Sequence, residues 1–207
     1  MKLKGLYAIT DAKLTPYDEI ERYVSEAIRG GVRILQLRDK EEASDEELYG
    51  VAVKLKHLCK ANDVTFIIDD RVLLAKAVDA DGIHIGIEDI ELCRAREIIG
   101  EGKIIGVSCY GDLERAKNVI KDGADYVAFG SFFPSPTKPH AKVVDKSVLT
   151  KAKSLGVPVC AIGGITADNG GELVLAGADM LSVISSLWSG DIYKNSFELS
   201  SFYKNLS

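Results

Sequence analysis

Short apolar runs alternate with longer amphipathic stretches along the whole of this 207-residue chain. Most of the runs are apolar at every position, which is typical of parallel strands that are buried on both faces. The eight predicted strands span residues 6–10, 34–37, 65–68, 82–85, 104–107, 126–129, 157–162 and 180–184. This alternation predicts an α/β protein with a parallel sheet.

The amphipathic stretches carry the signals that begin and end helices. Ser44, with Glu47 three residues later, matches a capping box and predicts a helix start. Gly31, Gly123 and Gly177 stand where a helix end needs a left-handed residue, and a strand follows each within a few residues. The predicted helices span 17–29, 44–61, 70–78, 90–99, 112–121, 145–155, 166–175 and 191–205.

Eight strands alternating with eight helices in about 200 residues predict a single (β/α)8 TIM barrel. A doubly wound open sheet is the alternative, and it fits less well because no GxGxxG motif follows the first strand. The sequence has no linker or low-complexity segment, so residues 1–207 are expected to form one catalytic domain.

The composition of the chain argues against several kinds of binding partner and site. The net charge is −5, from 31 acidic and 26 basic residues, which argues against non-specific binding to nucleic acid. The four cysteines include no CxxC pair, so neither a zinc site nor a disulfide framework is expected, and Cys109 and Cys160 are expected to be buried thiols. No run resembles a signal peptide or a membrane span. We expect a cytoplasmic protein that binds neither nucleic acid nor membrane, and a homo-oligomer is left open.

The segment 130–144 directly follows the sixth predicted strand and is long for a strand–helix connection. It holds three prolines and several groups that suit an anion, among them Ser135, Thr137 and Lys138. From these residues alone, an anion clamp and a proline-rich surface loop are both open.

In a TIM barrel the active site lies at the carboxyl ends of the strands. The second predicted strand ends in Gln36, Arg38 and Lys40, which alternate and therefore point the same way in an extended segment. Burying two cations and an amide is unfavourable without an anion to meet them. This pattern favours ligand binding over a strand end that faces solvent.

Carboxylates follow the third and fourth strands. Asp70 and Asp89 suit Mg²⁺, which usually takes one or two carboxylates and completes its shell with phosphate and water. Helix capping by both residues is an equally open alternative. His84 lies among apolar residues and is expected to be a satisfied core histidine. No Cys–His or Ser–His pairing is evident, so nucleophilic catalysis is not expected.

Small residues follow the seventh and eighth strands, at Gly163, Gly164 and Ser185. Glycine turns at these positions recur as phosphate sites in barrels, although Gly163 and Gly164 could form only a tight turn. Together with Arg38, Lys40 and Lys138, they indicate two anion-binding zones and hence two phosphorylated substrates.

Eight segments together resemble the thiamine phosphate synthase (thiamine-phosphate pyrophosphorylase) family, in the family's order and over nearly the whole chain. They are GLYAITD, ILQLRDK, IIDDR, ADGIHIGIED, IIGVSCY, GADYVAFGSFFPSPTKP, VPVCAIGGI and the VISS turn. The combination of QLRDK, the TKP loop and AIGGI is specific, whereas any one of them alone is weak.

The resemblance implies a transferase of thiamine biosynthesis. A hydroxymethylpyrimidine pyrophosphate would lose pyrophosphate, by a dissociative route, and be captured by the nitrogen of a thiazole phosphate. The implied pyrimidine-pyrophosphate site consists of Gln36, Arg38, Lys40, Asp69, Ser108 and Lys138. The implied thiazole-phosphate site consists of Ser135, Pro136, Thr137, Gly164, Ile184 and Ser185. Asp70 and Asp89 would hold Mg²⁺.

Two positions depart from the family's pattern: Asp69 stands where Asn is usual, and Ile87 where Gln is frequent. Asp69 adds a negative charge beside the expected metal site. Thiazole tautomerase relatives, a sugar-phosphate isomerase or epimerase, and a non-catalytic ligand-binding protein are the alternatives. The tautomerase relatives lack the full pyrophosphate-binding set that is present here.

Overall fold

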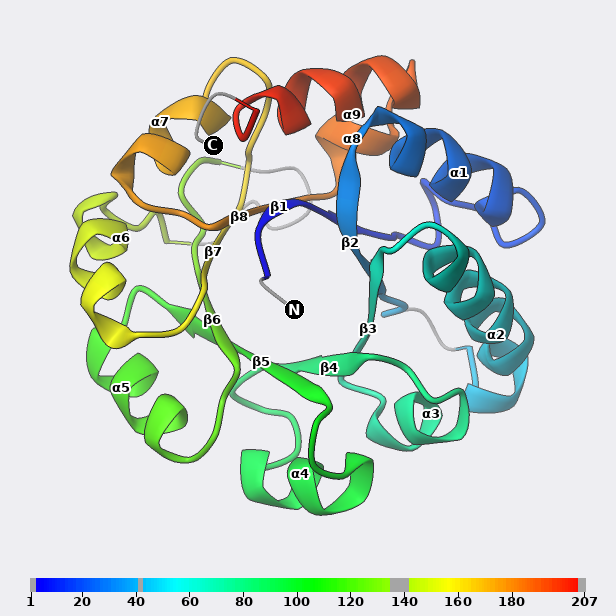
Figure 1. Ribbon diagram of the computed structural model, residues 1–207, viewed down its shortest axis with the longest axis horizontal. Helices are drawn as coiled ribbons and strands as arrows, with labels where there is room; N and C mark the ends of the chain where they lie inside the picture. The colour runs from blue at the N-terminus through cyan, green and yellow to red at the C-terminus, as the bar shows by residue number, and fades with distance from the viewer. Residues whose placement is uncertain (1–2, 41–42, 135–141, 205–207) are drawn as a thin grey trace.

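The computed structural model describes residues 3–40, 43–134 and 142–204. Eight parallel strands form a closed ring, and the helices surround it on the outside (Figure 1). The strands are β1 (Gly5–Ile9), β2 (Val32–Leu37), β3 (Thr65–Asp69), β4 (Gly82–Ile85), β5 (Ile104–Tyr110), β6 (Tyr126–Phe129), β7 (Val159–Ile162) and β8 (Met180–Val183). They pair in sequence order and β8 pairs with β1, so the predicted (β/α)8 barrel is confirmed.

The strands are apolar on both faces because each face has its own core. In β1, Leu6 and Ala8 pack in the layer between strands and helices, while Tyr7 and Ile9 point into the barrel interior. The interior cluster is small, and it also contains polar atoms that the site uses below. This arrangement explains why the strands read as unbroken apolar runs rather than as an alternating pattern.

The helices follow the predicted order with local differences. They are α1 (Ile20–Gly30), α2 (Asp45–Ala61), α3 (Val72–Ala77), α4 (Leu92–Ile99), α5 (Leu113–Lys121), α6 (Ser147–Ala152), α7 (Gly170–Ala176), α8 (Ser185–Trp188) and α9 (Ile192–Ser201). A short 3-10 helix, Lys153–Leu155, extends α6. The prediction placed the start of α7 too early, because Asn169 accepts a hydrogen bond from the Thr166 N–H and closes a turn there. It also missed α8, whose single turn is too short to give a periodic pattern.

Helix ends and thiols match their predictions. Gly31, Gly123 and Gly177 all have positive φ, at 115°, 102° and 121°. Cys109 and Cys160 are buried free thiols, and burial raises the pKa of Cys109 to about 12. Within the described ranges, no helix is long and apolar enough to cross a membrane.

The capping box at the start of α2 is formed as predicted. The Glu47 N–H donates to the Ser44 hydroxyl, and the Glu47 carboxylate accepts from the Ser44 N–H at 2.7 Å. We expect Ser44→Ala to lower the free energy of unfolding by about 1 kcal/mol, the usual cost of losing such a cap. Urea denaturation measures it. Ser25→Ala is the control, since the Ser25 hydroxyl only returns to the Glu21 carbonyl within α1, and a similar loss there would contradict the capping role.

Candidate active site

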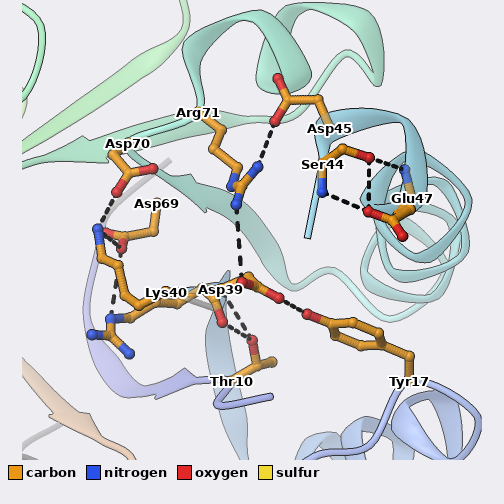
Figure 2. Close-up of polar contacts among 11 residues, drawn as sticks. Thr10, Tyr17, Asp39, Lys40, Ser44, Asp45, Glu47, Asp69, Asp70 and Arg71 are labelled. Atoms are coloured by element: carbon orange, nitrogen blue, oxygen red, sulfur yellow. Dashed lines mark hydrogen bonds and ion pairs between the residues drawn. The ribbon is translucent and has the colours of Figure 1, made fainter. Parts of the chain in front are cut away.

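The described site residues gather at the carboxyl ends of the strands. Arg38 and Lys40 follow β2, Asp69 ends β3, and Asp70 comes directly after it. Figure 2 shows that the side chains of Lys40, Asp69 and Asp70 point toward one another. Lys40 Nζ lies 3.1 Å from Asp69 Oδ2 and also contacts the Asp70 carboxylate, while Arg38 Nε lies 3.6 Å from Asp69 Oδ2. We call these four residues the ion-pair cluster.

Burial and charge act against each other in the ion-pair cluster. Burial raises the pKa of Asp69, although Lys40 and Arg38 oppose the rise. Burial also raises the pKa of Asp70, and Asp89 contributes to the rise at both carboxyls by like-charge repulsion. The pKa of Lys40 is raised because its contacts with Asp70 and Asp69 outweigh its burial. The carboxylates of Asp69, Asp70 and Asp89 therefore lie close enough to interact with one another and with two cations, Arg38 and Lys40. Because negative groups outnumber positive ones here, a bound cation would be stabilised at this place.

The alternative in which Asp70 and Asp89 cap helices is wrong. Arg71 occupies the N-cap of α3 and Glu91 that of α4, and neither helix has a side-chain cap. Asp89 instead accepts a hydrogen bond from the Gly86 N–H at 2.5 Å. No three His, Cys, Asp or Glu side chains of the described residues form a metal cluster. The donor set nevertheless fits Mg²⁺, which needs only one or two carboxylates when phosphate oxygens complete its shell.

A second set of contacts holds the segment that carries Arg38 and Lys40. Asp39 is buried, accepts a hydrogen bond from the Tyr17 hydroxyl, and lies 3.9 Å from the Arg71 guanidinium (Figure 2). Arg71 also pairs with Asp45 at 2.7 Å, which ties the start of α2 to the same place. This support could not be predicted from the sequence, because there Asp39 and Arg71 are only neighbours of the expected ligand-binding residues.

Gln36 and Ser108 are joined by hydrogen bonds that cross the barrel interior. Gln36 Nε2 donates to the Tyr7 hydroxyl at 2.7 Å, and the Tyr7 and Tyr126 hydroxyls are 2.9 Å apart. His84 lies between Tyr126, 2.9 Å from Nδ1, and the Ser108 hydroxyl, 2.9 Å from Nε2. We call these five residues the hydrogen-bond relay. The prediction of a satisfied histidine is confirmed.

The expectation that the chain has no Ser–His pairing is wrong, because His84 and Ser108 are hydrogen-bonded. Strands β4 and β5 are neighbours with His84 opposite Gly106, so Ser108 lies two residues further along the same face of β5. Tyr7 and Tyr126 were also missed, because an aromatic residue in an apolar run indicates core packing. Only knowledge of which strand positions face the interior could have found them.

The turn after β7 lies against the first part of the segment that follows β6. The Phe132 N–H donates to the Ile162 carbonyl at 3.2 Å, and the Phe133 N–H donates to the Gly163 carbonyl at 3.0 Å. Gly164 belongs to this turn, and Ile184 and Ser185 follow the neighbouring strand β8. Ser135, Pro136, Thr137 and Lys138 lie outside the described residues. A shared phosphate site at these strand ends therefore stays a prediction.

Comparison with known proteins identifies the family. The family model described as thiamine monophosphate synthase matches residues 6–187. A thiamine-phosphate synthase of Wolinella succinogenes is 50% identical over 195 residues, which cover 93% of this chain and 89% of the relative. One of Marinobacter nauticus is 46% identical over 186 residues, covering 90% and 83%.

A solved structure agrees with the sequence relatives. The thiamine phosphate pyrophosphorylase of Pyrococcus furiosus matches with a TM-score of 0.89 at 40% identity, covering 99% of this chain and 96% of that one. The relatives span nearly the full length of the barrel, so the likeness is not confined to one motif. The chain therefore belongs to the thiamine monophosphate synthase family, a family of transferases.

Proposed function

We propose that the protein is a thiamine phosphate synthase. It joins 4-amino-2-methyl-5-(diphosphooxymethyl)pyrimidine to 4-methyl-5-(2-phosphooxyethyl)thiazole, or to the carboxylated thiazole, and releases pyrophosphate. The observation that carries the proposal is the ion-pair cluster at the same end of the barrel as Gln36 and Ser108. Cations and carboxylates suit a pyrophosphate, and the polar ends of the relay suit a heterocycle beside it.

Leaving-group stabilisation is the role of the ion-pair cluster in this reaction. Arg38, Lys40 and, by family correspondence, Lys138 contact the pyrophosphate and stabilise the charge that develops as it departs. Asp70 and Asp89 hold Mg²⁺, which when bound supplies further positive charge to the leaving group. Lys40 must then exchange its contact with Asp70 for one with the substrate. The protein supplies charge and orientation rather than a nucleophile.

The second substrate binds across the barrel mouth from the ion-pair cluster. Gly164, Ile184 and Ser185, with Ser135, Pro136 and Thr137, hold the thiazole phosphate. The thiazole nitrogen is thereby directed at the pyrimidine methylene carbon. That carbon becomes electron-deficient as pyrophosphate leaves, and the thiazole nitrogen forms the new bond. Positioning of two bound reactants removes much of the entropic part of the barrier. We also propose that the enzyme acts in the cytoplasm and that the whole chain forms a single domain.

Asp69 should weaken the binding of a free anion. Its carboxylate is 3.1 Å from Lys40, so it competes with pyrophosphate for that cation. Like charges about 6 Å apart repel by about 3 kcal/mol at an effective dielectric constant of ~20. We expect Asp69→Asn to bind inorganic pyrophosphate about tenfold more tightly than the wild type without Mg²⁺, a gain of about 1.4 kcal/mol. Isothermal titration calorimetry measures the affinity.

The same charge change elsewhere provides the control. Asp79→Asn removes a carboxylate that pairs with Lys103, in the turn that precedes β4 at the opposite end of the barrel. Its affinity for pyrophosphate should equal that of the wild type. Weaker binding in Asp69→Asn would mean that Asp69 orders the cations rather than competing for them.

Product analysis with each substrate omitted in turn separates the candidate functions. A synthase forms thiamine phosphate only when both substrates and Mg²⁺ are present. A tautomerase relative converts a thiazole precursor without any pyrimidine. A ligand-binding protein binds the substrates in stoichiometric amounts but does not turn them over. Absence of thiamine phosphate at high enzyme concentration would end the synthase proposal.

A further inference from the structure

The hydrogen-bond relay connects five side chains across the barrel interior, and the proposed reaction does not by itself require this connection. Its members come from five strands, β1, β2, β4, β5 and β6, and the bond between Tyr7 and Tyr126 joins strands that are not neighbours in the ring. Both tyrosines are buried. A bond that crosses the interior and uses two buried hydroxyls is a specific feature, since apolar side chains would fill the same space more simply.

A glycine on β5 makes room for the relay. A Cβ atom on Gly106 would lie 1.9 Å from Cζ and 2.3 Å from the hydroxyl of Tyr126, so no other residue fits there without moving that ring. The imidazole of His84 stacks on the same ring with centroids 5.6 Å apart. The Tyr126 hydroxyl is therefore held between Tyr7 and His84.

The donors of the relay run in one direction. Gln36 donates its amide N–H to Tyr7, so the single proton of the Tyr7 hydroxyl turns to Tyr126. The proton of Tyr126 then turns to Nδ1 of His84. Burial raises the pKa of both phenols well above the usual value, so both hydroxyls keep these protons. A neutral His84 that accepts at Nδ1 carries its proton on Nε2 and donates it to Ser108.

We infer that Tyr7, Tyr126 and His84 are positioning residues that fix Ser108 as a hydrogen-bond donor to the pyrimidine substrate. Because Ser108 accepts from His84, its own proton is directed at a ligand atom that must be an acceptor, such as an unprotonated ring nitrogen. With the ring nitrogen beside the exocyclic group as that acceptor, the site selects aminopyrimidines over oxopyrimidines, in which this nitrogen carries a proton. The identity of the ligand rests on the proposed function, whereas the direction of the relay does not.

The opposite direction would give a different chemistry. If the Gln36 amide were turned so that its oxygen accepts from Tyr7, every donor in the relay would reverse. His84 would then carry its proton on Nδ1 and accept from Ser108 at Nε2, which is the arrangement of a serine nucleophile with its base. The position of one proton on His84 separates a binding site from a Ser–His dyad.

Nitrogen-15 NMR of histidine-labelled protein measures that position directly. The chain has three histidines, and the spectrum of His84→Gln identifies the signals of His84. We expect a neutral ring protonated at Nε2 in the wild type, and loss of this fixed state in Tyr126→Phe. A ring protonated at Nδ1, or at both nitrogens, would overturn the direction. Tyr7→Phe breaks the relay at another point and replaces Tyr126→Phe if that variant fails to fold.

Binding measurements test the consequence for selectivity. The probes are 4-amino-5-(hydroxymethyl)-2-methylpyrimidine monophosphate and its 4-oxo analogue. A site with a fixed hydrogen-bond donor should prefer the amino compound by about 100-fold, and Tyr126→Phe should reduce that preference to about tenfold or less. Tyr203→Phe is the matched control, because it makes the same change just after α9, where Tyr203 packs against the core between strands and helices, and it should leave the preference intact.

The outcomes separate this inference from the proposed function. An unchanged preference in Tyr126→Phe overturns the positioning role even if thiamine phosphate is formed. If neither probe binds to the wild type, the assignment of the ligand is overturned together with its selectivity. If both probes bind as expected but no product forms, the inference stands and the proposed reaction fails.

Discussion

Asp70→Asn should lower kcat/KM by about 10²–10³, the usual effect of removing one group that stabilises charge in the transition state. Asp70 is half-buried, contacts Lys40, and feels the charge of Asp89. An amide oxygen is a weaker ligand for Mg²⁺ than a carboxylate, so the variant should also need more Mg²⁺ for half-maximal rate. Steady-state kinetics over a series of Mg²⁺ concentrations measures both effects.

Asp79→Asn is a close control for this change. Asp70 and Asp79 both have positive φ, at 48° and 53°, and each pairs with a lysine. The two substitutions therefore share a left-handed backbone and the loss of a charged partner for a lysine, and differ in burial and in the end of the barrel that they alter. Asp79→Asn should keep the wild-type rate. If Asp70→Asn keeps a rate within about threefold of wild type with the same Mg²⁺ requirement, Asp70 is not a metal ligand.

Gly163→Ala should disrupt the contact between the β7 turn and the segment after β6. Gly163 has φ of 103°, and a Cβ there would lie 1.9 Å from Ser131 Oγ and 2.6 Å from Ser131 Cα. The left-handed backbone costs about 1–2 kcal/mol and the overpacking about 1–3 kcal/mol. We expect the free energy of unfolding to fall by about 3 kcal/mol, and kcat/KM for the thiazole phosphate to fall at least about tenfold.

Gly156→Ala separates the two causes. Gly156 also has positive φ, at 82°, but a Cβ there would meet nothing within 4 Å. It should lose only the backbone part of the stability, about 1–2 kcal/mol, and keep its activity. Urea denaturation and initial rates test both variants. Equal losses of activity in the two variants would show that the close approach of Ser131 to the turn has no role in the site.

The barrel could be predicted because its signals are local. Most strands are apolar on both faces, and markers such as the Ser44–Glu47 box and Gly31 lie within a few residues of the helix ends that they define. Closure of the ring follows from the number and order of these elements. The start of α7 and the single turn of α8 were missed because side-chain turns and one-turn helices leave no periodic pattern.

Site residues could likewise be predicted where their signal is local, and were missed where it depends on contacts between distant strands. Arg38, Lys40, Asp69 and Asp70 stand out in sequence, since charged residues directly after apolar runs need a reason to be there. The relay could not be found, because Tyr7 and Tyr126 are 119 residues apart and meet only when the ring closes. The relay depends on contacts between distant strands, whereas the pattern within each single strand indicates only core packing.

Phosphorus-31 NMR of a reaction containing both substrates and Mg²⁺ tests the proposed synthase most directly. The enzyme should convert the pyrimidine pyrophosphate into free pyrophosphate, with thiamine phosphate appearing in an equal amount, and neither product should form when the thiazole phosphate is left out. Release of pyrophosphate without thiamine phosphate would indicate hydrolysis. No change in either substrate would contradict the assignment of a synthase.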